Sequence, residues 1–275
     1  MKPKHYVYSS KKRDDFLTIV NNQRDIPSDY VFMPKNIFFK VGSWLFNYGV
    51  AIPILWCISK ATNHTKVVNK RKLMKQVKHT GYIIYSNHVL MSDGFIPAVF
   101  NCWPRRTYII SLPETLMVNK PFQILLKMLG TVPLPGGFKS GMNFLKFLKE
   151  KLDKNCAVAI YPEATIWPYY TGQRPIREGS FKYPRMFDKP AVFSCTTFRK
   201  PTGLLKKFKK PRIVIYLSDA VYPCRNIVAK EDEKRIEKLY VQFIEKISNM
   251  KENYAVNDYV LDQKALEKFK EKPGK

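Results

Sequence analysis

Short apolar runs alternate with amphipathic helical segments along most of the sequence after Gly81. The apolar runs, which predict strands, are 81–86, 106–112, 156–162, 189–198 and 212–217. Apolar residues recur at helical spacing in 121–129, 139–153 and 236–247. Apolar runs of this length are typical of strands that helices cover on both faces. The alternation therefore predicts an α/β domain with a mostly parallel central sheet flanked by helices.

The composition changes at two places and predicts three parts of the chain. We expect an N-terminal region over residues 1–65, the α/β domain over 66–250, and a polar, Lys-rich tail over 251–275 that is loosely held. The first 30 residues contain no apolar run of the kind found in secretory signal peptides, so no cleaved signal peptide is expected.

The N-terminal region contains an apolar segment, residues 41–58, without a charged side chain. Its length is at about the lower limit for crossing a bilayer, and Pro53 weakens that interpretation. Trp44, Tyr48 and Trp56 are aromatic residues of the kind enriched at membrane interfaces. We favour a helical segment embedded in the interface of the cell membrane, with the rest of the protein on the cytoplasmic side. A buried helical hairpin and a true membrane span are the alternatives.

The net charge of the chain is strongly positive. Forty-eight Lys and Arg against 22 Asp and Glu give a formal charge of +26, which indicates a polyanionic partner. Anionic lipid, nucleic acid and an acidic or phosphorylated carrier all fit. No recognised nucleic-acid-binding module is present, so nucleic acid is not expected. The basic segment 198–212 is interleaved with apolar residues and predicts contact with an anionic membrane, or else a solvated loop.

The five cysteines are scattered and form no CxxC pair. No histidine lies near them at metal-ligand spacing, so we expect no metal site. Most of them are predicted to be small buried hydrophobic residues. An odd number of cysteines without a disulfide framework is typical of a reducing compartment.

One of the four histidines, His88, directly follows an apolar run and has a carboxylate, Asp93, five residues downstream. On a regular helix these two side chains would lie about 140° apart and could not meet. They can meet only if the chain turns between them, with His88 at the strand exit and Asp93 in the first helical turn. The carboxylate would then bind one ring nitrogen and leave the other free as a base. The spacing alone fits two structural capping residues at least as well.

Four blocks occur in order along the chain: NHVLMSD (87–93), LGTVPLPGG (129–137), YPEAT (161–165) and DKPAVFSCTTF (188–198). Together they make the sequence similar to the glycerolipid acyltransferase family, which includes the 1-acylglycerol-3-phosphate acyltransferases. The segment NHVLMSD (87–93) has the family's NHx4D pattern, and YPEAT (161–165) resembles its Phe-Pro-Glu-Gly-Thr-Arg block. LGTVPLPGG (129–137) and DKPAVFSCTTF (188–198) occupy the places of two further blocks. The resemblance covers roughly half of the chain, from about Gly81 to Leu217.

The resemblance implies direct transfer of a fatty acyl group from a thioester to the hydroxyl of a lysophospholipid. His88 would be the general base, Asp93 would orient it, and Glu163 and Thr165 would bind the acceptor. The expected acceptor is 1-acylglycerol-3-phosphate, which would give phosphatidic acid. A different lysolipid acceptor and a non-catalytic anionic-lipid-binding protein are the alternatives. No cofactor is implied beyond the donor, which is acyl-CoA or acyl-carrier protein.

The sequence departs from the family at its arginines. LGTVPLPGG lacks the family's arginine, and the second block has Ala164 for Gly and Ile166 for Arg, followed by the insertion-like WPYYTGQRP. Arg174 and Arg177 follow closely and could supply the guanidinium groups that bind phosphate. As loop residues they could equally have no specific role. The acceptor head group is therefore left open.

Overall fold

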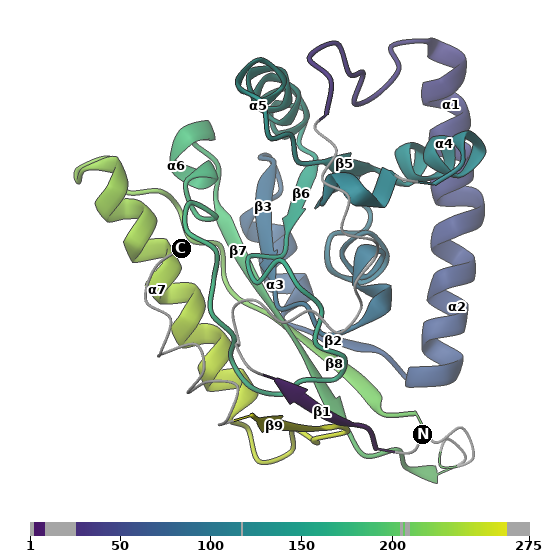
Figure 1. The fold of residues 1–275 in the computed structure, drawn as a ribbon, viewed down its shortest axis with the longest axis vertical. Helices are drawn as coiled ribbons and strands as arrows, with labels where there is room; N and C mark the ends of the chain where they lie inside the picture. Colours follow the sequence, from purple (N-terminus) through teal and green to yellow (C-terminus); the bar gives the residue numbers. More distant parts are fainter. Residues whose placement is uncertain (1–2, 9–25, 117, 204–205, 207–209, 263–275) are drawn as a thin grey trace.

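A seven-stranded sheet forms the centre of the protein (Figure 1). The computed structural model describes residues 3–8, 26–116, 118–203, 206 and 210–262. The strands lie in the order β2-β8-β7-β3-β6-β4-β5, and neighbours are parallel except β7 and β8. Their bounds are β2 Lys66–Val68, β3 Tyr82–Ser86, β4 Thr107–Ser111, β5 Thr131–Pro133, β6 Ala157–Ile160, β7 Ala191–Arg199 and β8 Arg212–Leu217. The predicted mostly parallel sheet is confirmed.

Each of the five apolar runs coincides with one strand to within a few residues, and each segment with helical spacing lies within one helix. The predicted helices are α4 (Lys120–Leu129), α5 (Phe138–Asp153) and α7 (Ala229–Ser248). Two short helices, α3 (Lys70–Gln76) and α6 (Tyr183–Phe187), and the three-residue strands β2 and β5 were not predicted. A helix of five to seven residues, or a strand of three, contains too few side chains to establish a periodic pattern.

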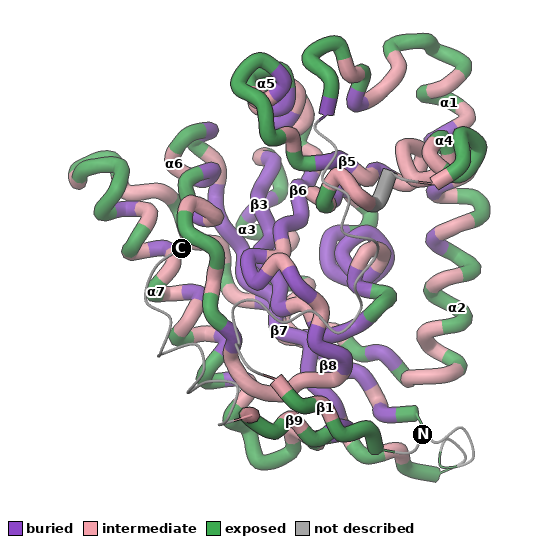
Figure 2. The backbone as a smooth tube through the Cα atoms, viewed as in Figure 1, coloured by how far each residue is buried: buried purple, intermediate pink, exposed green. Residues whose placement is uncertain are grey.

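The hydrophobic core lies on both faces of the sheet, and the central strands are buried (Figure 2). All five residues of β3 are buried, and they alternate between the two faces. Ile83 and Tyr85 pack in a cluster with residues of α5, α6 and α7. Tyr82 and Ile84 pack in a second cluster with residues of α2 (Ile52–Asn63), α3 and the π-helical turn η3 (Pro97–Asn101).

The N-terminal apolar segment is one continuous helix of 27 residues from Ile37 to Asn63. It consists of α1 (Ile37–Leu45), a π-helical stretch η1 (Phe46–Ala51) and α2 (Ile52–Asn63). At 1.5 Å per residue it is about 40 Å long. By length and composition it could cross a membrane, and only 17% of its apolar window is buried. The alternative of a buried helical hairpin is therefore wrong.

This long helix lies lengthwise along the α/β domain (Figure 1). Ser43 Oγ donates a hydrogen bond to the Met128 carbonyl at 2.9 Å, and Tyr48 Oη donates one to the Pro104 carbonyl at 3.0 Å. The other side of the helix is exposed although it is apolar. The exposed apolar residues are Ile37, Phe38, Val41, Trp44, Leu45, Val50, Ile54, Trp56 and Ile58.

A two-stranded parallel sheet joins the two end regions of the chain. It pairs β1 (His5–Tyr8) with β9 (Asp258–Leu261). Val256 and Asn257, just before β9, are buried. The expectation of a loosely held tail is therefore wrong for residues 251–262, because backbone pairing and side-chain burial hold them. Residues 263–275 lie outside the described part of the chain.

The cysteines are less buried than expected. Cys102 and Cys195 are buried, whereas Cys156 and Cys224 are only partly buried. Cys57 is exposed, because the long helix that carries it turns much of its apolar surface to the outside. All five thiols are free.

Candidate active site

The segment after β3 is fixed to the neighbouring strand β7 by one side chain. Asn87 Oδ1 accepts a hydrogen bond from the Thr196 amide at 2.8 Å, and Asn87 Nδ2 donates one to the Thr196 carbonyl at 3.0 Å. Both residues are buried. His88, the next residue, therefore leaves the sheet at its carboxyl edge in a defined position, where sites of α/β proteins are usually found.

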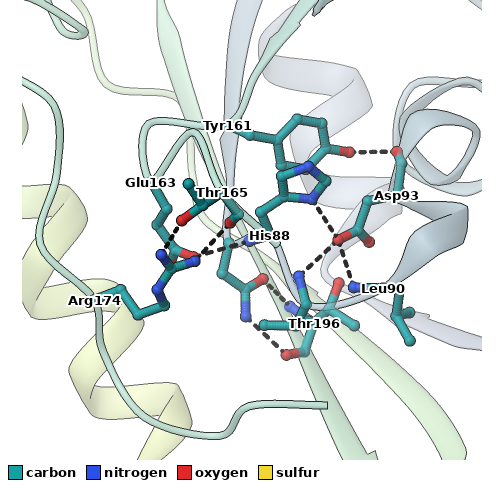
Figure 3. A network of polar contacts seen from close by, with 10 residues as sticks. His88, Leu90, Asp93, Tyr161, Glu163, Thr165, Arg174 and Thr196 are labelled. Carbon is teal, nitrogen blue, oxygen red and sulfur yellow. Dashed lines mark hydrogen bonds and ion pairs between the residues drawn. The ribbon is translucent and has the colours of Figure 1, made fainter. Parts of the chain in front are cut away.

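His88 and Asp93 are in direct contact (Figure 3). Asp93 lies in a single 3-10 turn, η2 (Met91–Gly94), and its Oδ2 is 3.0 Å from His88 Nδ1. The same oxygen accepts hydrogen bonds from the amides of Val89 and Leu90 at 2.7 and 2.8 Å. The chain turns between the two residues, as the sequence required for them to meet.

This contact determines which ring nitrogen of His88 is available for chemistry. An ionised carboxylate only accepts hydrogen bonds, so Nδ1 carries the proton that faces Asp93. In the neutral imidazole Nε2 is then unprotonated and can accept a proton. The Asp93 side chain is 1% exposed and that of His88 is 17% exposed. The buried carboxylate thus orients a partly accessible base.

Tyr161, at the end of β6, contacts both members of the pair. Its ring stacks on the imidazole of His88 with 4.3 Å between the ring centroids and 27° between the planes. Its hydroxyl donates a hydrogen bond to the Asp93 carbonyl at 2.5 Å. Burial, with a smaller contribution from the Asp93 charge, raises the pKa of Tyr161 well above its ordinary value. The phenol is therefore neutral and remains a donor at physiological pH.

Glu163, Thr165 and Arg174 form a second buried cluster beside His88 (Figure 3). The His88 amide donates to Glu163 Oε2 at 3.2 Å, and Arg174 Nη1 lies 3.4 Å from the same oxygen. Arg174 also donates to the Thr165 carbonyl at 2.5 Å and to the Thr165 hydroxyl. The guanidinium group therefore joins the YPEAT block to the insertion that follows it.

The charges in this cluster are removed from water. The Arg174 side chain is 0% exposed and that of Glu163 is 3% exposed. Burial raises the pKa of the Glu163 carboxyl, although the charge of Arg174 and the hydrogen bond from the His88 amide partly oppose the shift. Because Arg174 is enclosed, its geometry favours a supporting role over the predicted phosphate contact. Arg177 is exposed, and its amide donates to the Pro162 carbonyl at 2.9 Å.

Comparisons with known proteins concern the family and the fold of the chain. Residues 64–195, which contain both clusters, match the model of the family described as Acyltransferase. This match covers just under half of the chain and identifies residues 64–195 as an acyltransferase domain. The fold is similar to the crystal structure of the 1-acyl-sn-glycerophosphate (LPA) acyltransferase PlsC from Thermotoga maritima, with a TM-score of 0.50 and 14% sequence identity. That match covers 77% of this chain and 88% of PlsC. No curated protein sequence matches the chain significantly.

One departure of this acyltransferase from its family has a structural meaning. Ala164 stands where the family has glycine, and its φ angle is +60°, in the left-handed region. Its amide donates to the Tyr161 carbonyl at 3.0 Å, so the chain turns sharply here. Glycine enters this region freely, whereas a residue with a Cβ is strained there by roughly 1–2 kcal/mol.

Two residues of the acyltransferase site were not singled out from the sequence. Tyr161 was noted only as part of a motif, and Trp167 only as part of the insertion. The Trp167 amide donates to the His88 carbonyl at 3.3 Å, and the Trp167 side chain is fully buried. Residues that act by packing carry no chemical signal in a single sequence. Among the described residues, no group of three or more His, Cys, Asp or Glu side chains could hold a metal ion.

Proposed function

We propose that this acyltransferase moves a fatty acyl group from an acyl thioester to the free hydroxyl of a lysophospholipid. The contact between His88 Nδ1 and Asp93 Oδ2 is the observation that carries the proposal. The proposed acceptor is 1-acylglycerol-3-phosphate, and the product is phosphatidic acid. The similarity in fold to an enzyme described as an LPA acyltransferase supports this choice. A different lysophospholipid is the second candidate, because the arginine positions of the family are altered here.

The proposed chemistry is a single acyl transfer without a covalent enzyme intermediate. His88 Nε2 takes the proton of the acceptor hydroxyl as the oxygen attacks the thioester carbonyl carbon. Asp93 stabilises the imidazolium that forms. The carbon–sulfur bond then breaks, and the leaving thiolate receives the proton from the imidazolium. The ester and the free thiol are the products, and the base is regenerated.

The acceptor phosphate is proposed to bind beside this pair. Arg177 is exposed and follows the YPEAT block closely, so its guanidinium is available to an anionic group. Glu163 and Thr165 are proposed to shape the acceptor site, with Arg174 holding both in place. This assignment gives the two arginines different roles, which substitutions can separate.

The membrane interface is proposed as the place where the reaction occurs. The long helix from Ile37 to Asn63 presents a row of exposed apolar side chains, and it lies along the domain rather than projecting from it (Figure 1). A helix in this orientation embeds in one leaflet together with the domain surface beside it. The net charge of +26 favours a surface of anionic lipid. Free cysteines favour the cytoplasmic side.

The decisive experiment compares two histidine substitutions in the purified full-length protein. His88→Ala should reduce transfer from acyl-CoA to 1-acylglycerol-3-phosphate by roughly 10²- to 10⁴-fold, the usual contribution of a general base. Binding to liposomes should not change. His79→Ala is the matched control, because His79 is exposed and has no hydrogen bond among the described residues. It should retain wild-type turnover.

Two outcomes would contradict the proposal. Unchanged turnover in His88→Ala would exclude this histidine as the base. Liposome binding by the wild type without turnover on any of a panel of lysophospholipids would indicate a non-catalytic lipid-binding protein. A panel that varies the head group at constant chain length also identifies the acceptor.

A further inference from the structure

A pocket rich in cations lies at one end of the sheet, away from the His88–Asp93 pair. It has a volume of about 800 Å³ and is formed by β2, β7, β8 and residues 251–255 after α7. Its basic side chains are Lys66, Arg199, Lys200, Arg212 and Lys251. Glu252 is its one acidic side chain. We call this the basic pocket. Its volume lies within the range of pockets that bind small molecules.

The five cations of the basic pocket outnumber its one carboxylate, that of Glu252. None of the five forms an ion pair with a described carboxylate, although lysines elsewhere do so, such as Lys149 with Asp153 at 2.6 Å. Arg212 Nε is buried and has no hydrogen-bond partner among the described residues. Like charges gathered in one pocket repel each other, and a bound polyanion would relieve this repulsion.

Two aromatic side chains lie among these cations. Tyr216 and Tyr254 both line the basic pocket. Arg199 Nη2 donates a hydrogen bond to the Tyr216 hydroxyl at 3.0 Å, and Lys200 Nζ lies 5.6 Å from the centre of the Tyr254 ring. Aromatic rings that stack with a base, beside cations that bind phosphates, are the usual chemistry of nucleotide recognition.

The basic pocket is connected to the His88 turn through a short series of contacts. The Tyr254 amide donates to the Phe198 carbonyl at 2.9 Å, and the Phe198 ring packs on Tyr169 at 5.2 Å between centroids. The Tyr169 amide donates to the Val89 carbonyl at 2.8 Å, next to His88. Along β7, Arg199 lies three residues beyond Thr196, which is about 10 Å. The basic pocket and the His88 turn are therefore close enough for one extended ligand to reach both.

We propose that the basic pocket binds the nucleotide end of a coenzyme A thioester, the acyl donor of the reaction. This inference rests on the proposed function and names the donor that the proposed function leaves open. The ligand class is a nucleotide with clustered phosphates, joined by a flexible arm to the thioester at His88. A concave pocket of this volume accommodates a nucleotide, whereas a folded carrier protein needs a broader contact surface.

The test removes charge from the basic pocket without disturbing its walls. Lys200 and Lys251 are exposed, so Lys200→Gln/Lys251→Gln should fold normally. Isothermal titration with unacylated coenzyme A should show a Kd increased by about tenfold or more. The ratio of kcat/KM for acyl-CoA to kcat/KM for acyl-pantetheine, which lacks the nucleotide, should fall by a similar factor. Lys234→Gln/Lys238→Gln, on the exposed side of α7, removes the same charge and is the control.

The results separate this inference from the proposed function. Suppose that Lys200→Gln/Lys251→Gln has the same affinity for coenzyme A as the control variant, and the same ratio of kcat/KM for acyl-CoA to kcat/KM for acyl-pantetheine. This result would overturn the inference, even if the enzyme transfers acyl groups. Weaker binding to anionic vesicles with unchanged coenzyme A affinity would also overturn it and assign the pocket to lipid head groups. A loss of activity with acyl-carrier protein as the donor, but not with acyl-CoA, would also overturn the inference. Coenzyme A binding that depends on the pocket, in a protein without turnover, would support the pocket and contradict the proposed function.

Discussion

The phenol ring of Tyr161 covers one face of the His88 imidazole, and its hydroxyl is bonded to the backbone carbonyl of Asp93. One side chain that directly follows β6 therefore contacts both the histidine that follows β3 and the aspartate in the next turn. Asp93 restrains the edge of the imidazole, and Tyr161 restrains its face. The orientation of the base depends on both contacts.

Tyr161→Leu should lower kcat strongly, by roughly 10- to 100-fold, while the KM for the lysophospholipid changes little. The leucine side chain fills part of the space but does not provide a flat surface for the imidazole, so the base is less well oriented. Tyr161→Phe keeps the ring and loses only the hydrogen bond to Asp93. It should retain most of the activity and lose about 1 kcal/mol of stability. Equal kcat values for the two variants would contradict a role for the ring.

Arg174→Met should destabilise the fold by about 3 kcal/mol or more, because the buried Glu163 carboxylate would lose its counter-charge. Arg177→Gln should leave the melting temperature within about 1 °C of the wild type, because Arg177 is exposed. It should raise the KM for the lysophospholipid. Thermal denaturation and steady-state kinetics measure both effects. A normal melting temperature for Arg174→Met would show that this guanidinium does not brace the cluster.

The pH dependence of stability should differ between the wild type and Glu163→Gln. Burial raises the pKa of Glu163 above its ordinary value of 4.5, so the folded state holds this proton more tightly than the unfolded chain does. The free energy of unfolding of the wild type relative to the variant should therefore fall as the pH rises above about 4.5, and level off above the folded pKa. Urea denaturation at a series of pH values measures this difference. A difference that does not change with pH would contradict the raised pKa.

Trp44→Ser/Trp56→Ser should reduce partitioning onto anionic vesicles by about tenfold or more without lowering the melting temperature. Both rings are exposed on the long helix, at 60% and 47%, so the fold loses little when they are removed. Vesicle sedimentation measures the partitioning. Val228→Ser, an exposed apolar residue just before α7, is the control and should bind normally. Equal binding by the two variants would exclude the helix as the membrane contact.

Ala164→Gly should stabilise the protein by up to about 1 kcal/mol. The substitution relieves the left-handed strain at a φ of +60°, and the greater freedom of glycine in the unfolded chain offsets part of the gain. Ala229→Gly, at the exposed start of α7, has no such strain and should destabilise by about 0.5–1 kcal/mol. The two free energies of unfolding should therefore change in opposite directions.

The strands and the contact between His88 and Asp93 could be predicted because their signals are local. The apolar run that forms β3 is typical of a strand in a sheet that is covered on both faces, and His88 follows this run directly. Asp93 was linked to His88 by a resemblance and by the need for a turn, which the 3-10 turn Met91–Gly94 provides. The long helix was found only in part, because the charge-free segment 41–58 stops before Lys40 and Lys60 whereas the helix continues beyond both.

The sequence could not show how Arg174 is used. An arginine close to the YPEAT block was predicted to bind a phosphate group. In the structure the Arg174 guanidinium instead contacts Glu163 and Thr165, and its side chain is 0% exposed. Enclosure depends on Trp167, whose ring lies 4.6 Å from the Arg174 guanidinium. Burial of this kind is set by the tertiary arrangement and has no pattern in the chain. The same holds for the basic pocket, whose five cations come from four separate segments.

The pairing of β1 with β9 also determines when the acyltransferase site is completed during synthesis. Trp167, which bonds the His88 backbone, stacks on Tyr259 of β9 at 5.0 Å between ring centroids. Lys4 and Asn257, hydrogen-bonded at 3.1 Å, are 253 positions apart in the sequence. At the usual rate of translation, β1 waits roughly 10 to 50 s for its partner. The Tyr259 ring therefore reaches Trp167 only after β9 has been synthesised, so the packing around the His88 turn is completed later than the seven strands of the central sheet.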